Sequence, residues 1–178
     1  MYFSGFSLEN ESNIFASFLQ KSEVIASGFS YGAIKLIESI LNDIEKNEHL
    51  HKRIDKIQLF SPAFFNDKDK KYKRMQLMFF QKNSATYCDN FLKNCGFSLE
   101  EKEKYFQMGT YEELEELLHY NWSEEKMHLL PKKNILIETF LGENDEIINS
   151  QNALAFFRKF GDVYFIKEGN HTLRYRKK

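Results

Sequence analysis

The residues best suited to chemistry in this sequence are five consecutive ones, Gly28-Phe29-Ser30-Tyr31-Gly32. They form a G-x-S-x-G pattern between the apolar run Val24-Ile25-Ala26 and the helix-like segment Ala33-Ile34-Lys35-Leu36-Ile37. A serine between a strand and a helix occupies a tight turn that projects its hydroxyl outward, and the flanking glycines let the two backbones approach closely. The pattern therefore predicts that Ser30 is a nucleophile for acyl transfer.

A serine hydroxyl is a weak nucleophile and needs a histidine base, whose ring in turn needs a carboxylate to orient it. Of the five histidines, only His171 follows the end of a predicted strand, within Gly169-Asn170-His171. The other four precede a strand or belong to a helical region, where a surface role is expected: His49, His51, His119 and His128. His171 is therefore the predicted base.

The acid is predicted on the loop that follows the strand over 135–140. Asp145 lies on this loop just before a helix, and so at the same edge of the sheet as the serine and the histidine. Glu143 and Glu146 are rivals on the same loop, whereas Asp162 precedes its strand and lies at the opposite edge. The chain order serine, acid, histidine is the order in which sheet-based serine hydrolases carry their triad.

Acyl transfer also needs donors that stabilise the tetrahedral oxyanion. The first expected donor is the backbone N–H of the residue after the nucleophile, Tyr31. The second is predicted from the Gly5-Phe6-Ser7 loop after an early strand, as the N–H of Phe6. Gly5 is alternatively an ordinary turn glycine.

The pattern of apolar residues predicts alternating strands and helices at both ends of the chain. Strands are expected over 2–3, 23–27, 54–60, 135–140 and 163–167, and helices over 8–20, 31–47 and 149–160. This alternation indicates an α/β fold with a mainly parallel sheet flanked by helices. With 178 residues, the chain is expected to form one domain, 1–178.

The middle of the chain, from about 67 to 130, shows helical patterns and no convincing strand. Its clearest helices are expected over 72–94 and 110–120. A helical insertion between two strands of the sheet suggests a cap over the active face. Alternatively, these helices only cover one side of the sheet.

Composition limits the other possibilities. A net charge of −1 gives no global preference for nucleic acid. Cys88 and Cys95 are seven residues apart, too far along a helix for a disulfide, so buried reduced thiols are expected. We find neither an H-E-x-x-H nor a C-x-x-C motif, so no metal or other cofactor is predicted. We also find no signal-peptide pattern and no apolar run of membrane-spanning length, so a cytoplasmic protein is expected.

Four segments together resemble the α/β-hydrolase esterases: 28–32, 59–65, 142–148 and 169–171. More narrowly, the opening Tyr2-Phe3-Ser4-Gly5-Phe6 and the elbow followed by Ala-Ile-Lys resemble the BioV-type pimeloyl-[acyl-carrier protein] methyl ester esterases. The resemblance covers essentially the whole chain. Typical α/β-hydrolases have a β-hairpin and a His-Gly loop before the elbow, whereas here the elbow arrives by residue 28. The sheet is therefore expected to be truncated at its N-terminal edge.

The resemblance implies hydrolysis of the methyl ester of pimeloyl-acyl-carrier protein to methanol and pimeloyl-acyl-carrier protein, in biotin biosynthesis. It implies Ser30 as nucleophile, His171 as base and Asp145 as the orienting acid, with acyl carrier protein as partner and neither nucleic acid nor membrane. The alternatives are a small-molecule carboxylesterase without a carrier partner and a non-catalytic binding protein with a hydrolase fold.

Two further sets of residues fit such a substrate. An apolar channel for the acyl chain is predicted from four phenylalanines, which are alternatively plain core: Phe64, Phe65, Phe79 and Phe80. An acidic carrier protein would dock on a basic rim. One candidate rim is Lys68, Lys70, Lys71, Lys73 and Arg74; another is Arg174, Arg176, Lys177 and Lys178. A solvated helix face is the alternative for either block.

Overall fold

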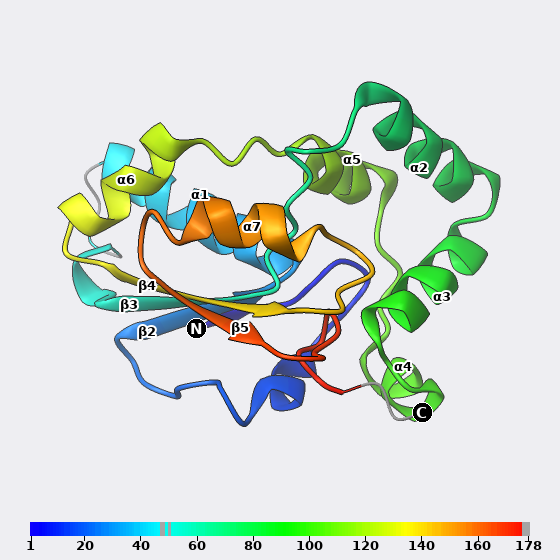
Figure 1. The fold of residues 1–178 in the computed structure, drawn as a ribbon, viewed down its shortest axis with the longest axis horizontal. Helices are drawn as coiled ribbons and strands as arrows, with labels where there is room; N and C mark the ends of the chain where they lie inside the picture. The colour runs from blue at the N-terminus through cyan, green and yellow to red at the C-terminus, as the bar shows by residue number, and fades with distance from the viewer. Residues whose placement is uncertain (47–48, 50, 176–178) are drawn as a thin grey trace.

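The computed structural model describes residues 1–46, 49 and 51–175. Its centre is a five-stranded parallel sheet (Figure 1). The strands lie in chain order, β1 to β5, and every neighbouring pair is parallel. Their bounds are β1 Tyr2–Phe3, β2 Ile25–Phe29, β3 Lys56–Phe60, β4 Leu136–Gly142 and β5 Asp162–Ile166. The predicted α/β fold with a parallel sheet is confirmed. The two-residue β1 is an edge strand, so the sheet is short on its N-terminal side, as predicted.

One face of the sheet is covered by helices α1 (Tyr31–Glu45), α6 (Glu124–Lys132) and α7 (Ser150–Phe157), as Figure 1 shows. Helix α1 forms because Ile34, Ile37 and Leu41 recur on one stripe, which packs on the sheet residues Ile57 and Leu59. Helix α7 starts at Asn149, whose side chain caps the backbone N–H of Asn152 at 3.0 Å. A short 3₁₀ helix, η2 (His51–Arg53), precedes β3.

The opposite face is covered by the segment between β1 and β2, and here the predicted helix over 8–20 is wrong. This segment forms only the 3₁₀ helix η1 (Glu11–Phe15), after Asn10 in a left-handed conformation with φ 60°. Its serines and asparagines favour turns over helix, because their side chains compete for backbone hydrogen bonds. The apolar residues of this segment pack on the sheet without forming a helix. The Phe15 ring, for example, stacks on Phe60 with centroids 4.8 Å apart.

Of the five helices between β3 and β4, the first four lie toward the carboxyl ends of the strands, while α6 covers the sheet (Figure 1). These four are α2 (Lys70–Lys82), α3 (Ser84–Cys95), α4 (Leu99–Tyr105) and α5 (Tyr111–His119). The single helix predicted over 72–94 is broken at Asn83, whose extended backbone (φ −161°) ends α2 while its side chain caps α3. Cys88 and Cys95 both lie on α3 and are buried free thiols, as predicted. Among the described residues, no helix is both long and apolar enough to cross a membrane.

Candidate active site

Ser30 stands in the turn between β2 and α1 in a strained conformation. Its φ is 52° and its ψ is −113°, a region that L-residues rarely adopt. Three backbone bonds hold it there: its N–H donates to the Phe60 carbonyl at 2.9 Å, and its carbonyl accepts from Ala63 at 3.1 Å and from Ala33 at 3.2 Å. The neighbouring strand β3 and the residues after it thus impose the turn.

The two glycines of the elbow are required by close contacts between backbones. A Cβ on Gly28 would lie 2.5 Å from the Gly32 carbonyl oxygen, and a Cβ on Gly32 would lie 2.0 Å from the Phe3 carbonyl oxygen. Gly28 therefore lets strand β2 pass the start of α1, and Gly32 lets α1 approach the end of β1. The G-x-S-x-G spacing follows from these two contacts.

Substituting Gly32 with alanine is expected to lower the free energy of unfolding by about 3 kcal/mol, because the clash is with fixed backbone. Denaturant unfolding measures this change. Gly169→Ala is the matched control, since its Cβ would meet nothing closer than 3.1 Å and Gly169 has no left-handed backbone. Equal stability of the Gly32→Ala and Gly169→Ala variants would contradict the close approach of α1 and β1.

The structure brings the three predicted catalytic side chains together. His171 Nε2 lies 3.0 Å from Ser30 Oγ, and His171 Nδ1 lies 2.6 Å from Asp145 Oδ2. All three side chains are buried. Because a carboxylate only accepts, Nδ1–H donates to Asp145, which leaves Nε2 to accept from the Ser30 hydroxyl. This tautomer can take the proton of Ser30 as its oxygen attacks a carbonyl carbon.

The Asp145 carboxylate is itself fixed by its loop. Its second oxygen, Oδ1, accepts from the backbone N–H groups of Ile147 at 2.7 Å and Ile148 at 3.1 Å. The imidazole of His171 also packs against the Phe29 ring, with centroids 5.1 Å apart. The base is therefore held in one orientation from two sides.

The rival residues lie elsewhere. The Glu143 carboxylate accepts from the Glu168 N–H at 2.9 Å, and Asp162 begins β5 at the opposite edge of the sheet. His119 is exposed at the end of α5, with its Nδ1 at 3.0 Å from the Glu115 carbonyl oxygen, and the His128 ring packs against Phe160. Among the described residues, no group of three or more His, Cys, Asp or Glu side chains is arranged to hold a metal ion.

Both predicted oxyanion donors have free backbone N–H groups. Neither the N–H of Tyr31, at the first turn of α1, nor that of Phe6 has an acceptor within the described part of the chain. The loop of Phe6 lies beside the elbow, because a Cβ on Gly5 would touch the Phe29 ring at 2.8 Å. The two donors therefore remain candidates for an oxyanion site.

Sequence reasoning missed Glu11, which fixes the Phe6 loop. Its fully buried carboxylate accepts from the Gly5 N–H at 2.9 Å and from the Tyr2 hydroxyl at 3.0 Å. Burial, followed by the charge and the hydrogen bond of Glu11, raises the pKa of Tyr2 well above its usual value. An isolated glutamate in a polar stretch carries no sequence signal of burial, so this contact could be found only in the folded chain.

A cavity of about 580 Å³ lies between the insertion and the Asp145 loop. Its lining includes two of the four predicted channel residues, Phe65 and Phe79, together with Tyr72, Tyr87, Phe91, Leu117, Leu118 and Ile147, and polar residues along α3. Phe91 packs edge-on against Phe6 at 5.6 Å, which places the cavity next to the candidate oxyanion loop. Ser30 is only 1% exposed and does not line this cavity.

The other two predicted channel residues lie in the core. Phe64 packs against Phe156 and Phe157 of α7, with centroids 5.3 and 5.9 Å apart. Phe80 is buried between Phe6 and Tyr87. Neither Phe64 nor Phe80 lines the cavity, so the channel prediction for these two residues finds no support in its lining.

The predicted docking residues divide into two groups. Lys70, Lys71 and Arg74 are exposed on α2, while Lys68 lies over the Tyr72 ring at 5.5 Å. Partial burial lowers the pKa of Lys73, although the charge of Asp67 opposes this shift.

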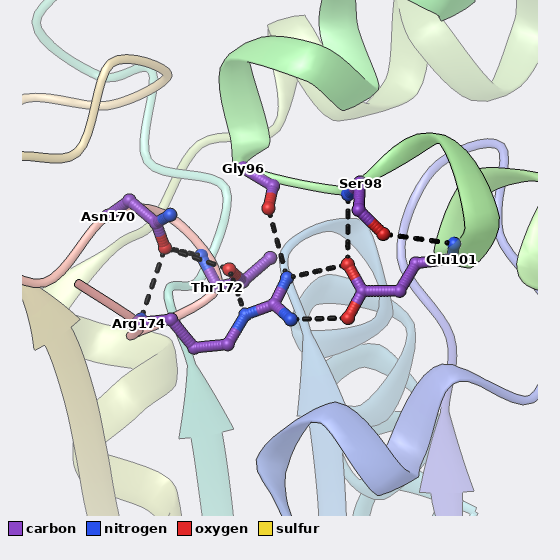
Figure 2. Close-up of polar contacts among 6 residues, drawn as sticks. All are labelled: Gly96, Ser98, Glu101, Asn170, Thr172 and Arg174. Atoms are coloured by element: carbon purple, nitrogen blue, oxygen red, sulfur yellow. Dashed lines mark hydrogen bonds and ion pairs between the residues drawn. The ribbon is translucent and has the colours of Figure 1, made fainter. Parts of the chain in front are cut away.

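The Arg174 guanidinium is paired with Glu101 and donates to Gly96 and Thr172 (Figure 2). It is therefore not an unpaired cation. The other members of this second block, Arg176, Lys177 and Lys178, lie outside the described residues.

Comparison with known proteins gives a likeness of fold. No family model and no curated protein sequence matches the chain. BioG from Haemophilus influenzae is similar with a TM-score of 0.56 and 14% identity, over 97% of this chain and 87% of that one. The carboxylesterase CesB from Bacillus subtilis has a TM-score of 0.52 and 13% identity, over 90% of this chain and 57% of its own.

The chain spans 57% of CesB and 57% of a carboxylesterase from Nitrososphaera gargenis (TM-score 0.55, 12% identity, 83% of this chain). At these identities the likeness shows the fold alone. The similarity to these neighbours extends over most of the chain, and with it over the five parallel strands and their flanking helices. The chain therefore has the α/β-hydrolase fold, in a truncated form whose sheet ends at β1.

Proposed function

We propose that this protein is a serine carboxylic ester hydrolase in which Ser30, His171 and Asp145 form the catalytic triad. The observation that carries the proposal is the distance of 3.0 Å between Ser30 Oγ and His171 Nε2, in a buried site where Asp145 fixes the ring at 2.6 Å. A serine held in a strained turn against an oriented imidazole has the geometry of acyl transfer.

In the first half-reaction, Ser30 Oγ attacks the ester carbonyl carbon while its proton moves to His171 Nε2. The N–H groups of Tyr31 and Phe6 stabilise the oxyanion of the tetrahedral intermediate. As this intermediate collapses, the bond to the alcohol oxygen breaks and the alcohol leaves with the proton of His171. Water then gives a proton to His171 and attacks the acyl-enzyme, and the carboxylic acid is released when that proton returns to Ser30.

The proposed substrate is the methyl ester of pimeloyl-acyl-carrier protein, in biotin biosynthesis. The sequence resemblance supports this choice, and so does the mixed lining of the cavity. Its lining combines apolar side chains, such as Phe65, Leu117 and Ile147, with the polar side chains of Asn90 and Asn94. Such a lining suits a linear acyl chain that carries polar groups. In this proposal the insertion over 67–130 is a cap, and the side chains between the cavity and buried Ser30 part when substrate binds.

Helix α2 is the proposed docking surface for the acidic carrier protein. Its outer side exposes Lys71 and Arg74 beside Met75, Met78 and Phe79, which are 40%, 56% and 53% exposed. Exposed apolar side chains rimmed by positive charge match an acidic partner that also contributes an apolar contact. The same helix lines the cavity through Tyr72, Gln76 and Phe79, so a carrier docked on it would stand at the mouth of the site.

The test is hydrolysis of the methyl ester of pimeloyl-acyl-carrier protein, followed by mass spectrometry of the intact carrier. We expect the wild-type enzyme to convert the ester to the acid, and the double variant Lys71→Glu/Arg74→Glu to lower kcat/KM about tenfold at low salt. The matched control is Lys132→Glu/Lys133→Glu, which makes the same change of charge at the exposed end of α6, before β4.

Dimethyl pimelate and p-nitrophenyl butyrate are assayed in parallel. Equal kcat/KM for the carrier-borne and free esters would reject the carrier and leave a small-molecule carboxylesterase. An enzyme that leaves every ester intact would reject hydrolysis altogether and indicate a non-catalytic binding protein.

A further inference from the structure

The loop that carries His171 contains two strained residues. It follows the end of β5 at Ile166, and both Glu168 (φ 56°) and Leu173 (φ 61°) have left-handed backbones although neither is glycine. Each such residue costs about 1–2 kcal/mol relative to a relaxed conformation. The loop therefore needs contacts that hold it in this shape.

The first set of contacts is local and surrounds His171. The Asn170 side-chain oxygen accepts from the Thr172 N–H at 2.9 Å, the Thr172 hydroxyl at 2.8 Å and the Arg174 N–H at 3.1 Å (Figure 2). The Asn170 N–H in turn donates to the Arg174 carbonyl at 2.9 Å. The residues before and after the histidine are thus tied to each other across it.

The second set of contacts joins the loop to α4. The Arg174 guanidinium forms a bidentate pair with Glu101, with Nη2 at 3.0 Å from Oε2 and Nη1 in contact with Oε1 (Figure 2). Its Nε donates to the Thr172 hydroxyl at 3.0 Å, and Nη2 also donates to the Gly96 carbonyl at 3.0 Å. All three nitrogens of the fork are therefore used, and they connect the loop to two points of the insertion.

The end of α3 makes the third contact. The Thr172 N–H donates to the Cys95 carbonyl at 3.2 Å. The next residue, Gly96, has a φ of 99°, and a Cβ there would lie 2.1 Å from the Asn170 side-chain nitrogen. Only glycine leaves room for Asn170 at this position. The end of α3, which belongs to the insertion, thus contacts both residues that flank His171 in the sequence.

From these contacts we infer that Arg174 is a positioning residue: paired with Glu101, it holds the His171 loop so that the imidazole stays between Ser30 and Asp145. The inference rests on the proposed function, and it gives the insertion a second role besides covering the site. A fork that forms two parallel bonds to a carboxylate fixes orientation as well as distance, which a single ammonium group does not.

Glu101 is prepared for this pairing by its own helix. Glu101 is the third residue of α4 and forms a capping box with the N-cap residue Ser98. Its Oε2 accepts from the Ser98 N–H at 2.9 Å, and its own N–H donates to Ser98 Oγ at 3.2 Å. Partial burial raises the pKa of Glu101, but the bonds from Arg174 and Ser98 outweigh this and hold it below its usual value. The carboxylate is therefore ionised and oriented toward Arg174 throughout the neutral pH range.

The test uses Arg174→Gln, Arg174→Lys and Glu101→Gln, each assayed with p-nitrophenyl butyrate, a small ester without a carrier. We expect Arg174→Gln and Glu101→Gln to lower kcat about 10- to 100-fold with little change in KM, because misplacement of the base affects the chemical step. The kcat of Arg174→Lys is expected to fall as well, since lysine keeps the positive charge but loses the planar guanidinium that binds a carboxylate through two bonds. The matched control is Lys102→Gln, which removes another ion pair between α4 and α3, with Asp89, that does not touch the loop.

A second readout does not depend on activity. With ring-¹⁵N-labelled histidine, we expect the His171 nitrogen shifts of the wild type to report a single Nδ1–H tautomer, and those of Arg174→Gln to report a mixture. If the wild type has the single tautomer but hydrolyses no ester, the proposed function fails while the positioning role stands. Wild-type kcat and tautomer in both Arg174→Lys and Glu101→Gln, the milder variants, would overturn the inference. A loss in Arg174→Gln confined to carrier-borne ester would instead make Arg174 a docking residue.

Discussion

Replacing Ser30 with alanine is expected to lower kcat for p-nitrophenyl butyrate by about 10⁴- to 10⁶-fold, because the oxyanion donors alone supply only a small residual rate. The Ser30 hydroxyl is the atom that faces His171 Nε2, at 3.0 Å, and no other hydroxyl is within hydrogen-bond distance of Nε2 among the described residues. Initial rates at saturating ester, with single-turnover assays for the residual activity, measure the effect.

Ser61→Ala is a close control for this variant. Ser61 follows β3 at the same edge of the sheet, is also buried and also has a left-handed backbone, with φ 40°. Its hydroxyl has no partner among the described residues, so its removal breaks no hydrogen bond. Retained activity in Ser30→Ala, or an equal loss in Ser61→Ala, would reject Ser30 as the nucleophile.

Ser30→Gly separates the chemistry of the elbow from its strain. Both Ser30→Ala and Ser30→Gly lose the hydroxyl, so both should be inactive. Glycine adopts φ 52° and ψ −113° without a Cβ clash, so the glycine variant is expected to be more stable than the alanine variant by about 1–3 kcal/mol. Denaturant unfolding of the two variants side by side measures the difference. Equal stability would mean that the turn stores no strain.

Replacing Asp145 with asparagine is expected to lower kcat about 10⁴-fold while the fold is kept. The amide oxygen can still accept from the N–H groups of Ile147 and Ile148, so the loop retains its anchors. The amide nitrogen then faces His171 Nδ1, which must become an acceptor. Nε2 carries the proton in that tautomer and is no longer able to take one from Ser30.

Steady-state rates and circular dichroism of Asp145→Asn check both halves of this prediction. Glu143→Gln is the matched control, because Glu143 lies on the same loop and its oxygen binds the Glu168 N–H at 2.9 Å. We expect it to keep kcat within about threefold, as is usual for a side chain outside the reacting groups. If Glu143→Gln were the inactive variant and Asp145→Asn the active one, the assignment of the acid would be reversed.

The sequence predicted that Ser30, Asp145 and His171 lie close together because the carboxyl ends of parallel strands lie at one edge of the sheet. In a parallel sheet, a residue that directly follows one strand lies at the same edge as a residue that directly follows another. The apolar runs near 25, 57, 137 and 164 located the ends of the strands to within two residues. Ser30, Asp145 and His171 therefore had to meet at one edge, whatever covers the faces of the sheet.

Elements that depend on long-range contacts were less predictable. The segment over 8–20 has the apolar spacing of a helix, but its phenylalanines pack on strands from distant parts of the chain, and Gln58 of β3 binds the backbone of Phe18 and Gln20. Likewise, the break at Asn83 lets α2 pack against both α3 and the distant helix α5. Local periodicity does not contain such information.

By itself, the sequence determined the α/β class, the order of the chemical residues and the need for glycine at 28 and 32, because each depends on a local pattern and a shared strand edge. Only the tertiary structure decided the contact partners of Arg174, Glu11, Phe64 and Phe80. These contacts join residues from separate elements. Whether a charge becomes a docking site or a buried anchor depends on which group the folded chain brings within 3 Å of it.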